Sequence, residues 1–417
     1  MKKIILSACI LFAANSKAQV IVDTVSTGLN YTNQIWYSLA KDEVKTQPKD
    51  NWDLGIEITG FSASILVNTQ KAGTAAYQTP YNRAQWSQFD TAGYTKWNAL
   101  HNSDTSWGIG ALNKVASGAD EDLGWGTYDV NTHFISGSRL FLLVSGGKFL
   151  KLSIDSLKNS VYKITYMNID GTDSTTFTVA KSAYKNKNFA YYDFATKSVI
   201  DREPSNIAWD LTFTKYIYNN YPLMGGGTMP YPVTGILQNK GVKIAEVTNV
   251  NDTIKDYAGR AFATRINEIG SDWKTFTGGT YVITDSLVYF VQDIDKNYWK
   301  VILKGFSGST LGNYMFTKEK LKNLVSVASF NADNRVAIYP NPAASGNSVY
   351  MITDFKGDLG ASNLVITDIN GKVVFQNTNI SLDGFGAIEI PFSFDKGVYF
   401  ISVQTQQGTM TQKLLSY

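Results

Sequence analysis

Short runs of residues rich in Val, Ile, Thr, Tyr and Phe recur along the chain, separated by Gly, Asn and Asp. Examples are Arg139–Val144, Ser160–Tyr166, Leu287–Gln292 and Val398–Gln404. Runs of this composition between turn-forming residues are typical of β-strands. Helical periodicity is scarce, and a few short helices fit the pattern, for instance near Ala84–Phe89. The pattern therefore predicts an all-β protein with few short helices.

The C-terminal part of the chain, residues 336–417, has the pattern of a small separate domain. It follows a small polar stretch, interpreted as a linker at 326–335, and opens with Val336–Pro342 (VAIYPNP). Asp368–Gly371 ends in Asn-Gly, which favours a type I′ hairpin turn. The strands expected after the opening segment are Ser348–Thr353, Asn363–Thr367, Lys372–Gln376, Ala387–Pro391, Val398–Gln404 and Thr409–Leu415. Short strands at this spacing predict an Ig-like β-sandwich.

The region before the linker contains an internal duplication. The matching segments are Asn51–Ile56 with Ala208–Phe213, Trp125–Ile135 with Trp273–Ile283, and Leu140–Ile154 with Val288–Leu303. Aromatic, apolar and Lys positions coincide over these pairs, and the second pair keeps a constant offset of 148 residues. Repetition of this kind indicates tandem copies of one folding unit. We therefore expect two homologous β domains, at residues 19–182 and 183–325.

The N-terminus has the parts of a secretory signal peptide. Lys2 and Lys3 precede an apolar stretch, Ile4–Ala14, that is too short to span a bilayer as a helix. Ser16 and Ala18 then place small residues where signal peptidase requires them. Residues 1–18 are therefore predicted to be removed. A lipid anchor on Cys9 is not expected, because the apolar run before it is too short.

Composition narrows the class of protein further. Cys9 is the only cysteine, so the mature chain has none and must rely on its apolar core. A formal net charge of +3 does not indicate nucleic acid or an anionic membrane as a partner. No later segment has the length and apolarity of a membrane span. Motifs of common enzyme classes are absent from the sequence, so the chain is not expected to be an enzyme.

The C-terminal domain resembles a known export signal. The YPNP segment, the ITDINGKVVF hairpin, the KGVYFISV strand and the terminal TQKLLSY are similar to the type A sorting domain of the type IX secretion system of Bacteroidetes. The resemblance implies that residues 336–417 interact with the type IX secretion machinery. It also implies passage across the outer membrane of a Gram-negative bacterium, with the mature protein secreted or held on the cell surface.

The duplicated unit resembles the HmuY family of haem-binding proteins. The residues that match are Asn51–Ile56, Trp125–Ile135 and Leu140–Ile154 in the first copy, with Trp209–Phe213, Trp273–Ile283 and Val288–Leu303 in the second. The resemblance implies a β-rich domain that clasps haem, with histidine or methionine side chains as axial ligands of the iron. It implies a hemophore-like function in haem and iron acquisition, with haem or a haemoprotein as the partner.

His101 and His133 are the only histidines, and both lie in the first repeat, 32 residues apart. A neutral imidazole is a strong ligand for haem iron, and two of them can fill both axial positions. His133 occupies the Thr-His position of the family pattern. We therefore predict His101 and His133 as the metal and cofactor ligands. Candidates for contact with the porphyrin are Trp97, Trp107, Trp125, Tyr128 and Phe134, and Arg139 and Lys148 are candidates for its propionates. Alternatively, both histidines are ordinary surface residues.

The second repeat offers no histidine. Position 133 corresponds to Tyr281, and Met224 and Met229 lie in a Gly-rich loop. Tyrosinate and methionine can both ligate haem iron, although a degenerate scaffold is the simpler interpretation. The aromatic content of 24 Tyr and 9 Trp also suits a surface that binds glycans. A glycan-binding or adhesive β-protein without haem is therefore the alternative function.

Overall fold

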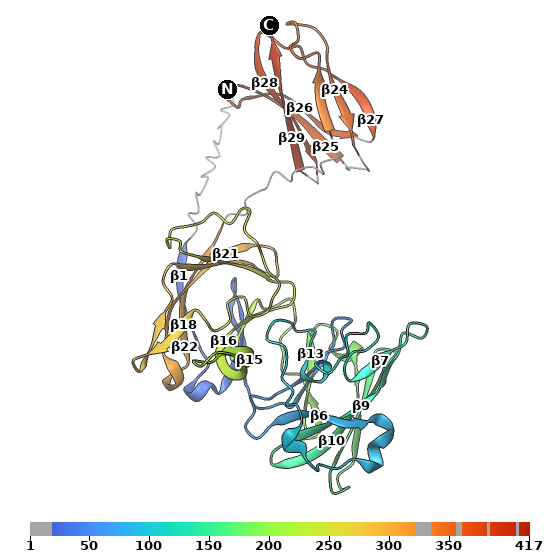
Figure 1. Ribbon diagram of the computed structural model, residues 1–417. Coiled ribbons are helices and arrows are strands. Elements are labelled where there is room, and N and C mark those ends of the chain that lie inside the picture. Colours follow the sequence, from blue (N-terminus) through green and yellow to red (C-terminus); the bar gives the residue numbers. More distant parts are fainter. Residues whose placement is uncertain (1–18, 322–334, 356–360, 382–383, 406–407) are drawn as a thin grey trace, which may run out of the picture. The chain divides into compact units, whose positions relative to one another are not determined.

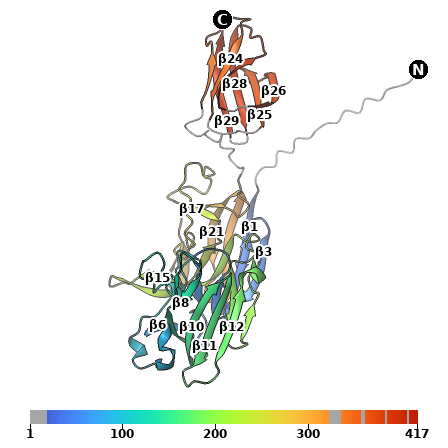
Figure 2. The same cartoon turned by 90° about the vertical axis from the view of Figure 1, so that its right-hand side faces the viewer.

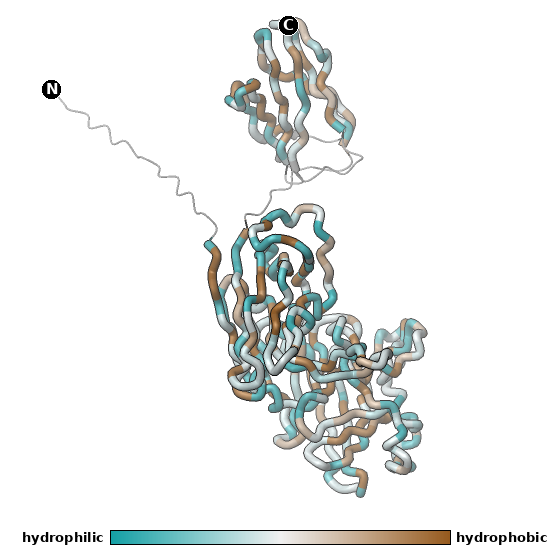
Figure 3. Tube along the Cα trace, turned by 60° about the vertical axis from the view of Figure 1, so that its left-hand side comes forward, coloured by the Kyte–Doolittle hydropathy of each residue, from teal (hydrophilic) through white to brown (hydrophobic). Residues whose placement is uncertain are grey.

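The computed structural model describes residues 19–321, 335–355, 361–381, 384–405 and 408–417. The predicted signal peptide and nearly all of the predicted linker lie outside these ranges. Strands dominate, and the helices of the described residues are short 3-10 turns, which confirms the all-β prediction. The chain divides at residues 322/323 into two units, each described by itself below. Hydrophobic residues recur along the strands of both units (Figure 3).

The first unit contains two lobes, each with a core of its own (Figure 1). Lobe A is formed by a continuous segment of the chain. Its strands are β4 (Leu54–Glu57), β5 (Ile65–Val67), β6 (Ala75–Asn82), β7 (Gly126–Tyr128), β8 (Ile135–Gly137), β9 (Arg139–Ser145), β10 (Lys148–Lys158), β11 (Val161–Asn168), β12 (Thr175–Ala180), β13 (Phe189–Asp193) and β14 (Ser198–Ile200). Its 3-10 helices are η2 (Arg83–Gln88), η3 (Tyr94–Lys96), η4 (Ala111–Asn113) and η5 (Lys181–Tyr184). Helix η2 is the short helix expected near Ala84–Phe89.

Lobe B is assembled from both ends of the first unit. Its strands are β1 (Val20–Ser26), β2 (Asn33–Ser38), β3 (Asp42–Pro48), β15 (Leu211–Pro222), β16 (Thr228–Gln238), β17 (Lys243–Thr248), β18 (Lys274–Thr277), β19 (Thr280–Ile283), β20 (Leu287–Gln292), β21 (Tyr298–Phe306) and β22 (Asn313–Lys320). Its 3-10 helices are η1 (Leu29–Tyr31) and η6 (Gly308–Thr310). Strand β1 pairs antiparallel with β22 over its whole length, from Val20 opposite Glu319 to Ser26 opposite Asn313.

The two lobes repeat one strand arrangement. Lobe A has a sheet β14-β13-β4-β5 and a second sheet in which β12, β11, β10, β9 and β6 are neighbours. Lobe B has a sheet β3-β2-β15-β16 and a second sheet β1-β22-β21-β20-β17. The hairpins β7–β8 and β18–β19 also correspond. Each strand of lobe A therefore has a counterpart in lobe B. The counterparts of the last three strands of lobe A, β12, β13 and β14, are β1, β2 and β3 at the start of the chain.

The predicted repeat boundaries, 19–182 and 183–325, stay a prediction about sequence similarity, because the strands are grouped differently in space. Strands β13 and β14 follow residue 182 but complete the sheet of β4, through the pair Tyr192–Leu54. Strand β2 lies near the N-terminus but completes the sheet of β15, through the pair Tyr37–Leu211. Each lobe is therefore completed by a hairpin that the repeat boundaries assign to the other.

The aromatic residues that mark the duplication are buried at matching places. Trp125 and Trp273 are both fully buried, in the cores of lobes A and B respectively. Trp52 and Trp209 are 9% and 2% exposed. The carbonyl oxygen of Trp52 accepts a hydrogen bond from Nδ2 of Asn68 at 3.0 Å. In the same way, the carbonyl oxygen of Trp209 accepts one from Nδ2 of Asn239 at 2.8 Å. The duplicated residues therefore form the same local structure in both lobes.

The second unit is a β-sandwich. Its strands are β23 (Arg335–Tyr339), β24 (Val349–Asp354), β25 (Ala361–Asp368), β26 (Val373–Ser381), β27 (Phe385–Ile390), β28 (Gly397–Thr405) and β29 (Gly408–Ser416). They form the sheets β23-β24-β27 and β26-β25-β28-β29, which Figure 2 shows in the upper, red part of the ribbon. Side chains from both sheets, such as Met351 and Ile401, share one core. The strands expected from the sequence agree with these to within a few residues.

The predicted type I′ turn in this unit is wrong. Gly371 has a φ of 81°, but Asn370 does not have the positive φ that a type I′ turn requires. The N–H of Asp368 donates to the carbonyl of Lys372, and the N–H of Gly371 donates to the carbonyl of Asp368. Asp368 Oδ1 also accepts the N–H of Asn370 at 2.8 Å, which stabilises a longer loop. The carboxylate of Asp368 thus selects a loop in which only the glycine is left-handed.

Candidate functional site

His133 lies in the turn of the β7–β8 hairpin of lobe A. Its φ is 58°, and its N–H donates to the carbonyl of Asp129 at 2.8 Å. Asp129 Oδ1 accepts the N–H groups of Asn131 and Thr132 at 2.8 and 3.1 Å, so the side chain of Asp129 shapes the turn. The imidazole is exposed, and its Nδ1 lies 2.6 Å from the hydroxyl oxygen of Tyr128. When the Nδ1 proton donates to Tyr128, the Nε2 atom is left with a free lone pair.

His101 is partly buried between β6 and η4. Its Nδ1 atom is buried and has no hydrogen-bond partner among the described residues. Burial lowers the pKa of His101, and the nearby Lys114 lowers it further. Both effects favour the neutral imidazole, which is the form that binds a metal.

A neighbouring asparagine anchors the stretch that carries His101. Asn102 Oδ1 accepts the N–H of Val67 and that of Ala111, both at 3.0 Å. Asn102 Nδ2 donates to the carbonyl of Val67 at 2.9 Å. These contacts tie the stretch to the end of β5. They could not be predicted from the sequence, because Asn102 and Val67 are 35 residues apart and no local motif links them.

Two of the other residues predicted to contact haem have structural roles of their own. Trp125 is fully buried, and its Nε1 donates to the carbonyl of Ala63 at 2.9 Å, so it serves the core instead of a porphyrin face. Arg139 forms two bonds of 2.7 Å to the carboxylate oxygens of Asp122. This ion pair holds the pKa of Asp122 well below its usual range and occupies the guanidinium. Lys148 is exposed.

The remaining aromatic candidates are partly accessible. Trp97 packs against Tyr81 and Phe89, and Lys158 lies over the ring of Phe134 at 5.7 Å. Trp107 is partly buried, and its Nε1 donates to the carbonyl of Gln238 in lobe B at 2.8 Å. Within the part of the chain that the structure describes, no three His, Cys, Asp or Glu side chains gather as a metal site. Haem needs fewer protein ligands than a bare ion does, because the porphyrin supplies the equatorial ones.

The ligand candidates of lobe B are placed differently from those of lobe A. Met224 is fully exposed and Met229 is 43% exposed, at the tip of the β15–β16 hairpin. Strands β15 and β16 extend to Pro222 and from Thr228, so the expected Gly-rich loop is only the turn of a long hairpin. Tyr281 hydrogen-bonds to Tyr31 and packs on Phe306.

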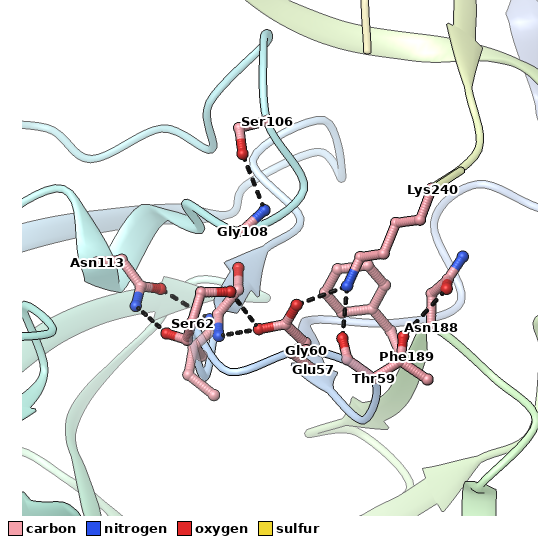
Figure 4. Close-up of polar contacts among 12 residues, drawn as sticks. Glu57, Thr59, Gly60, Ser62, Ser106, Gly108, Asn113, Asn188, Phe189 and Lys240 are labelled. Atoms are coloured by element: carbon pink, nitrogen blue, oxygen red, sulfur yellow. Dashed lines mark hydrogen bonds and ion pairs between the residues drawn. The ribbon is translucent and has the colours of Figure 1, made fainter. Parts of the chain in front are cut away.

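The junction between the lobes contains a buried carboxylate that the sequence analysis missed. Glu57 at the end of β4 is 1% exposed, and it pairs with Nζ of Lys240 in lobe B at 2.5 Å (Figure 4). Its other oxygen accepts the hydroxyl of Ser62 and the N–H of Ser64. Lys240 also donates to the carbonyl of Thr59 at 2.6 Å. Since every charge here is paired, this cluster fastens lobe B to lobe A.

A second buried cluster at the junction surrounds Arg202. Its guanidinium is 1% exposed and donates to Asn51, to Gln34 and to the carbonyl of Pro48 at 2.8–2.9 Å. It also lies 5.0 Å from the ring centres of Trp36 and Tyr191. An arginine in such an aromatic cage, with each of its three nitrogens donating a hydrogen bond, rigidifies the junction.

A cavity of about 90 Å³ lies at the junction, lined by Trp36, Trp52 and Trp209 among others. It is well below the roughly 300–1,000 Å³ of typical small-molecule sites. Neither histidine lines it. Its size is that of a packing space at the junction.

Comparisons with known proteins identify the C-terminal unit. A family model described as the secretion system C-terminal sorting domain matches residues 337–416. The unit is thus a sorting domain for the type IX secretion machinery, and the protein is exported to the cell surface or secreted. No HmuY-like family model matches the chain. Among the described residues, no helix has the length and apolarity needed to cross a membrane.

Other comparisons are uninformative about the two lobes. No curated protein matches the chain. Among solved structures, one similar chain is Escherichia coli alpha-2-macroglobulin activated by porcine elastase, at 9% identity and a TM-score of 0.16. The similarity covers 96% of this chain and 35% of that one, so this chain spans about a third of its length. A similarity this weak carries no argument about the fold.

Proposed function

We propose that this exported protein binds haem through lobe A, with His133 and His101 as the axial ligands of the iron. The observation that carries the proposal is the hydrogen bond of 2.6 Å between Tyr128 and Nδ1 of His133. Outer contacts of this kind orient metal-bound histidines and direct the other ring nitrogen to the metal. The resemblance of the repeats to HmuY proteins supports the same function, which would be the capture of haem for iron acquisition.

His101 is suited to the second axial position. Its partly buried ring is neutral over a wider pH range than a free imidazole, and Asn102 holds its backbone against β5. Haem would supply an iron that accepts two imidazole nitrogens. The chain would contribute the two imidazoles, the orientation that Tyr128 imposes on one of them, and partly exposed aromatic rings nearby.

A haemin titration of the full chain without residues 1–18 tests the proposal. We expect a shifted Soret band and the spectrum of a six-coordinate, low-spin haem. Both His133→Ala and His101→Ala should convert the spectrum towards five-coordinate haem. Val130→Ala is the matched control, because Val130 is an exposed residue near the same turn. A wild-type spectrum in the double histidine variant would contradict the proposal.

A further inference from the structure

Lobe B contains an open groove of about 710 Å³ that has no role in the proposed haem site. Strands β15, β16, β18 and β19 contribute its walls, together with Tyr31 of η1. Its volume lies in the range of sites that hold small molecules or segments of polymers. Neither histidine lines it.

Aromatic side chains dominate the walls of the groove. Tyr221 and Tyr231 face each other from the two arms of the β15–β16 hairpin, with ring centres 4.5 Å apart and planes inclined by 29°. Tyr218 meets Tyr221 edge to face at 6.2 Å. On the opposite hairpin, Phe276 packs against Tyr281 at 5.0 Å. Tyr221, Tyr231 and Phe276 are 36%, 45% and 63% exposed, although large aromatic rings are normally buried.

Two lysines in the groove have no carboxylate partner among the described residues. Lys215 forms no ion pair or side-chain hydrogen bond with any residue that the structure describes, and Lys274 donates to the backbone carbonyls of Thr234 and Ser271 at 2.7 and 3.3 Å. Lys274 is 9% exposed, and burial lowers its pKa to about 7. The one acidic residue of the lining is Asp272. A groove lined by two lysines without carboxylate partners and by one carboxylate favours an anionic ligand.

We propose that this groove binds an acidic polysaccharide, with sugar rings stacked on Tyr221 and Tyr231 and a sugar carboxylate paired with Lys215. A pyranose ring presents a face of C–H groups, which packs on an exposed aromatic ring, while its hydroxyls need hydrogen-bonding neighbours. Tyrosine hydroxyls and those of Ser271 and Thr275 provide them along the groove. A uronic acid carboxylate supplies the counter-charge that Lys215 lacks.

Isothermal titration of the full chain without residues 1–18 with oligogalacturonate tests this proposal, and a neutral cello-oligosaccharide of equal length is the comparison ligand. The acidic ligand should bind roughly tenfold more tightly than the neutral one, a ratio that corresponds to about 1.4 kcal/mol. Tyr221→Ala and Tyr231→Ala should each weaken binding of the acidic ligand by roughly tenfold, as base stacking on aromatics does. Lys215→Gln should reduce the preference for the acidic ligand.

Phe61→Ala and Lys163→Gln are the controls, because both side chains are exposed in lobe A, outside the groove. Equal affinity for the two oligosaccharides, no binding at all, or unchanged affinity in the tyrosine variants would overturn the proposal. The groove variants should leave the haemin titration unchanged. The groove and the haem site are therefore tested separately, and either can fail without the other.

Discussion

Asp53 and Asp210 form the same hydrogen bonds in the two lobes. The carboxylate of Asp53 accepts the N–H of Phe194 at 2.8 Å, and that of Asp210 accepts the N–H of Leu39 at 2.8 Å. Their own N–H groups donate to Tyr192 and to Tyr37, again at 2.8 Å in both cases. In each lobe a buried aspartate thus fastens the hairpin that lies far from it in the chain.

These bonds explain how the start of the chain completes lobe B. Leu39 follows β2, and Asp210 precedes β15, the strand with which β2 pairs. Asp210 is 1% exposed, and its second oxygen accepts the N–H of Ile294 at 2.9 Å. One carboxylate therefore joins three segments of lobe B, and both of its oxygens must act as acceptors.

Asp210→Asn should destabilise the first unit by about 1–3 kcal/mol, because the new amide group would face a backbone donor and leave it unpaired. Chemical denaturation followed by tryptophan fluorescence measures the change. Asp295→Asn replaces an exposed aspartate in a nearby turn and should have little effect. Equal stability of the Asp210 and Asp295 variants would show that the contact does not fasten the hairpin.

The segment 49–205 should fold alone, whereas 206–321 should not. The first segment carries every strand of lobe A, while the second lacks β1, β2 and β3. Without them, strands β22 and β15 become edges and expose Tyr314 and Phe213, which are buried in the whole chain. Circular dichroism melts of the two fragments measure this. Addition of a peptide covering residues 20–48 should restore cooperative unfolding to 206–321. A cooperative melt of 206–321 alone would contradict the prediction.

The sequence was sufficient to predict the strands and the duplication, but not the exchange of hairpins between the lobes. Val, Ile and aromatic runs predict strands because their side chains favour pleated, half-buried surfaces. Trp52 and Trp209 revealed the repeat because the same local packing selects the same residues. Sequence similarity cannot distinguish whether β2 pairs with β4 or with β15, because both strands begin at the leucine of the same Trp-Asp-Leu motif.

The candidate site likewise contains residues that the sequence indicates and contacts that it does not. His133 and its neighbour Tyr128 stay predicted site residues, singled out by their place in a repeated motif. The contact of Asn102 with Val67 and the approach of Tyr221 to Tyr231 depend on the tertiary structure. The Gly-rich loop expected around Met224 is shorter than predicted, because Tyr221 and Tyr231 on either side of it lie in the paired strands of a hairpin.

Lys274 should make the stability of lobe B depend on pH. Burial lowers its pKa from about 10.5 in the unfolded chain to about 7. Between these values the unfolded chain holds a proton that the folded chain does not, so the free energy of unfolding should rise as the pH increases from 7 to 10. The slope from one such group is at most about 1.4 kcal/mol per pH unit.

Urea denaturation at several pH values, for the wild type and Lys274→Met, measures this contribution as the difference between the two slopes. Lys163→Met provides the control for an exposed lysine. Parallel slopes in the wild type and the Lys274 variant would contradict the assignment.

Removal of residues 336–417 should block export without unfolding the first unit. The matched sorting domain lies within this segment, and the two units have separate cores. The truncated protein should accumulate in the periplasm, which cell fractionation measures. The full chain carrying Phe61→Ala serves as the control and should reach the outside of the cell. Truncated protein in the medium would mean that another segment directs export.

Tyr128→Phe should weaken haem binding while leaving both imidazoles in place. The variant keeps the aromatic ring but removes the hydroxyl that lies 2.6 Å from Nδ1 of His133. Without that contact the exposed imidazole is free to rotate, and its basicity falls. Loss of such an outer contact typically lowers metal affinity by about 10–100-fold.

Haemin titration monitored by the Soret band measures the affinity, and the spin state reports whether His133 is still bound. Tyr94→Phe removes a hydroxyl elsewhere in lobe A and should leave both readouts unchanged. In a His133→Ala background, Tyr128→Phe should have no further effect, because the tyrosine acts only through the histidine. An additional loss in that background would assign Tyr128 a direct contact with haem instead of a positioning role.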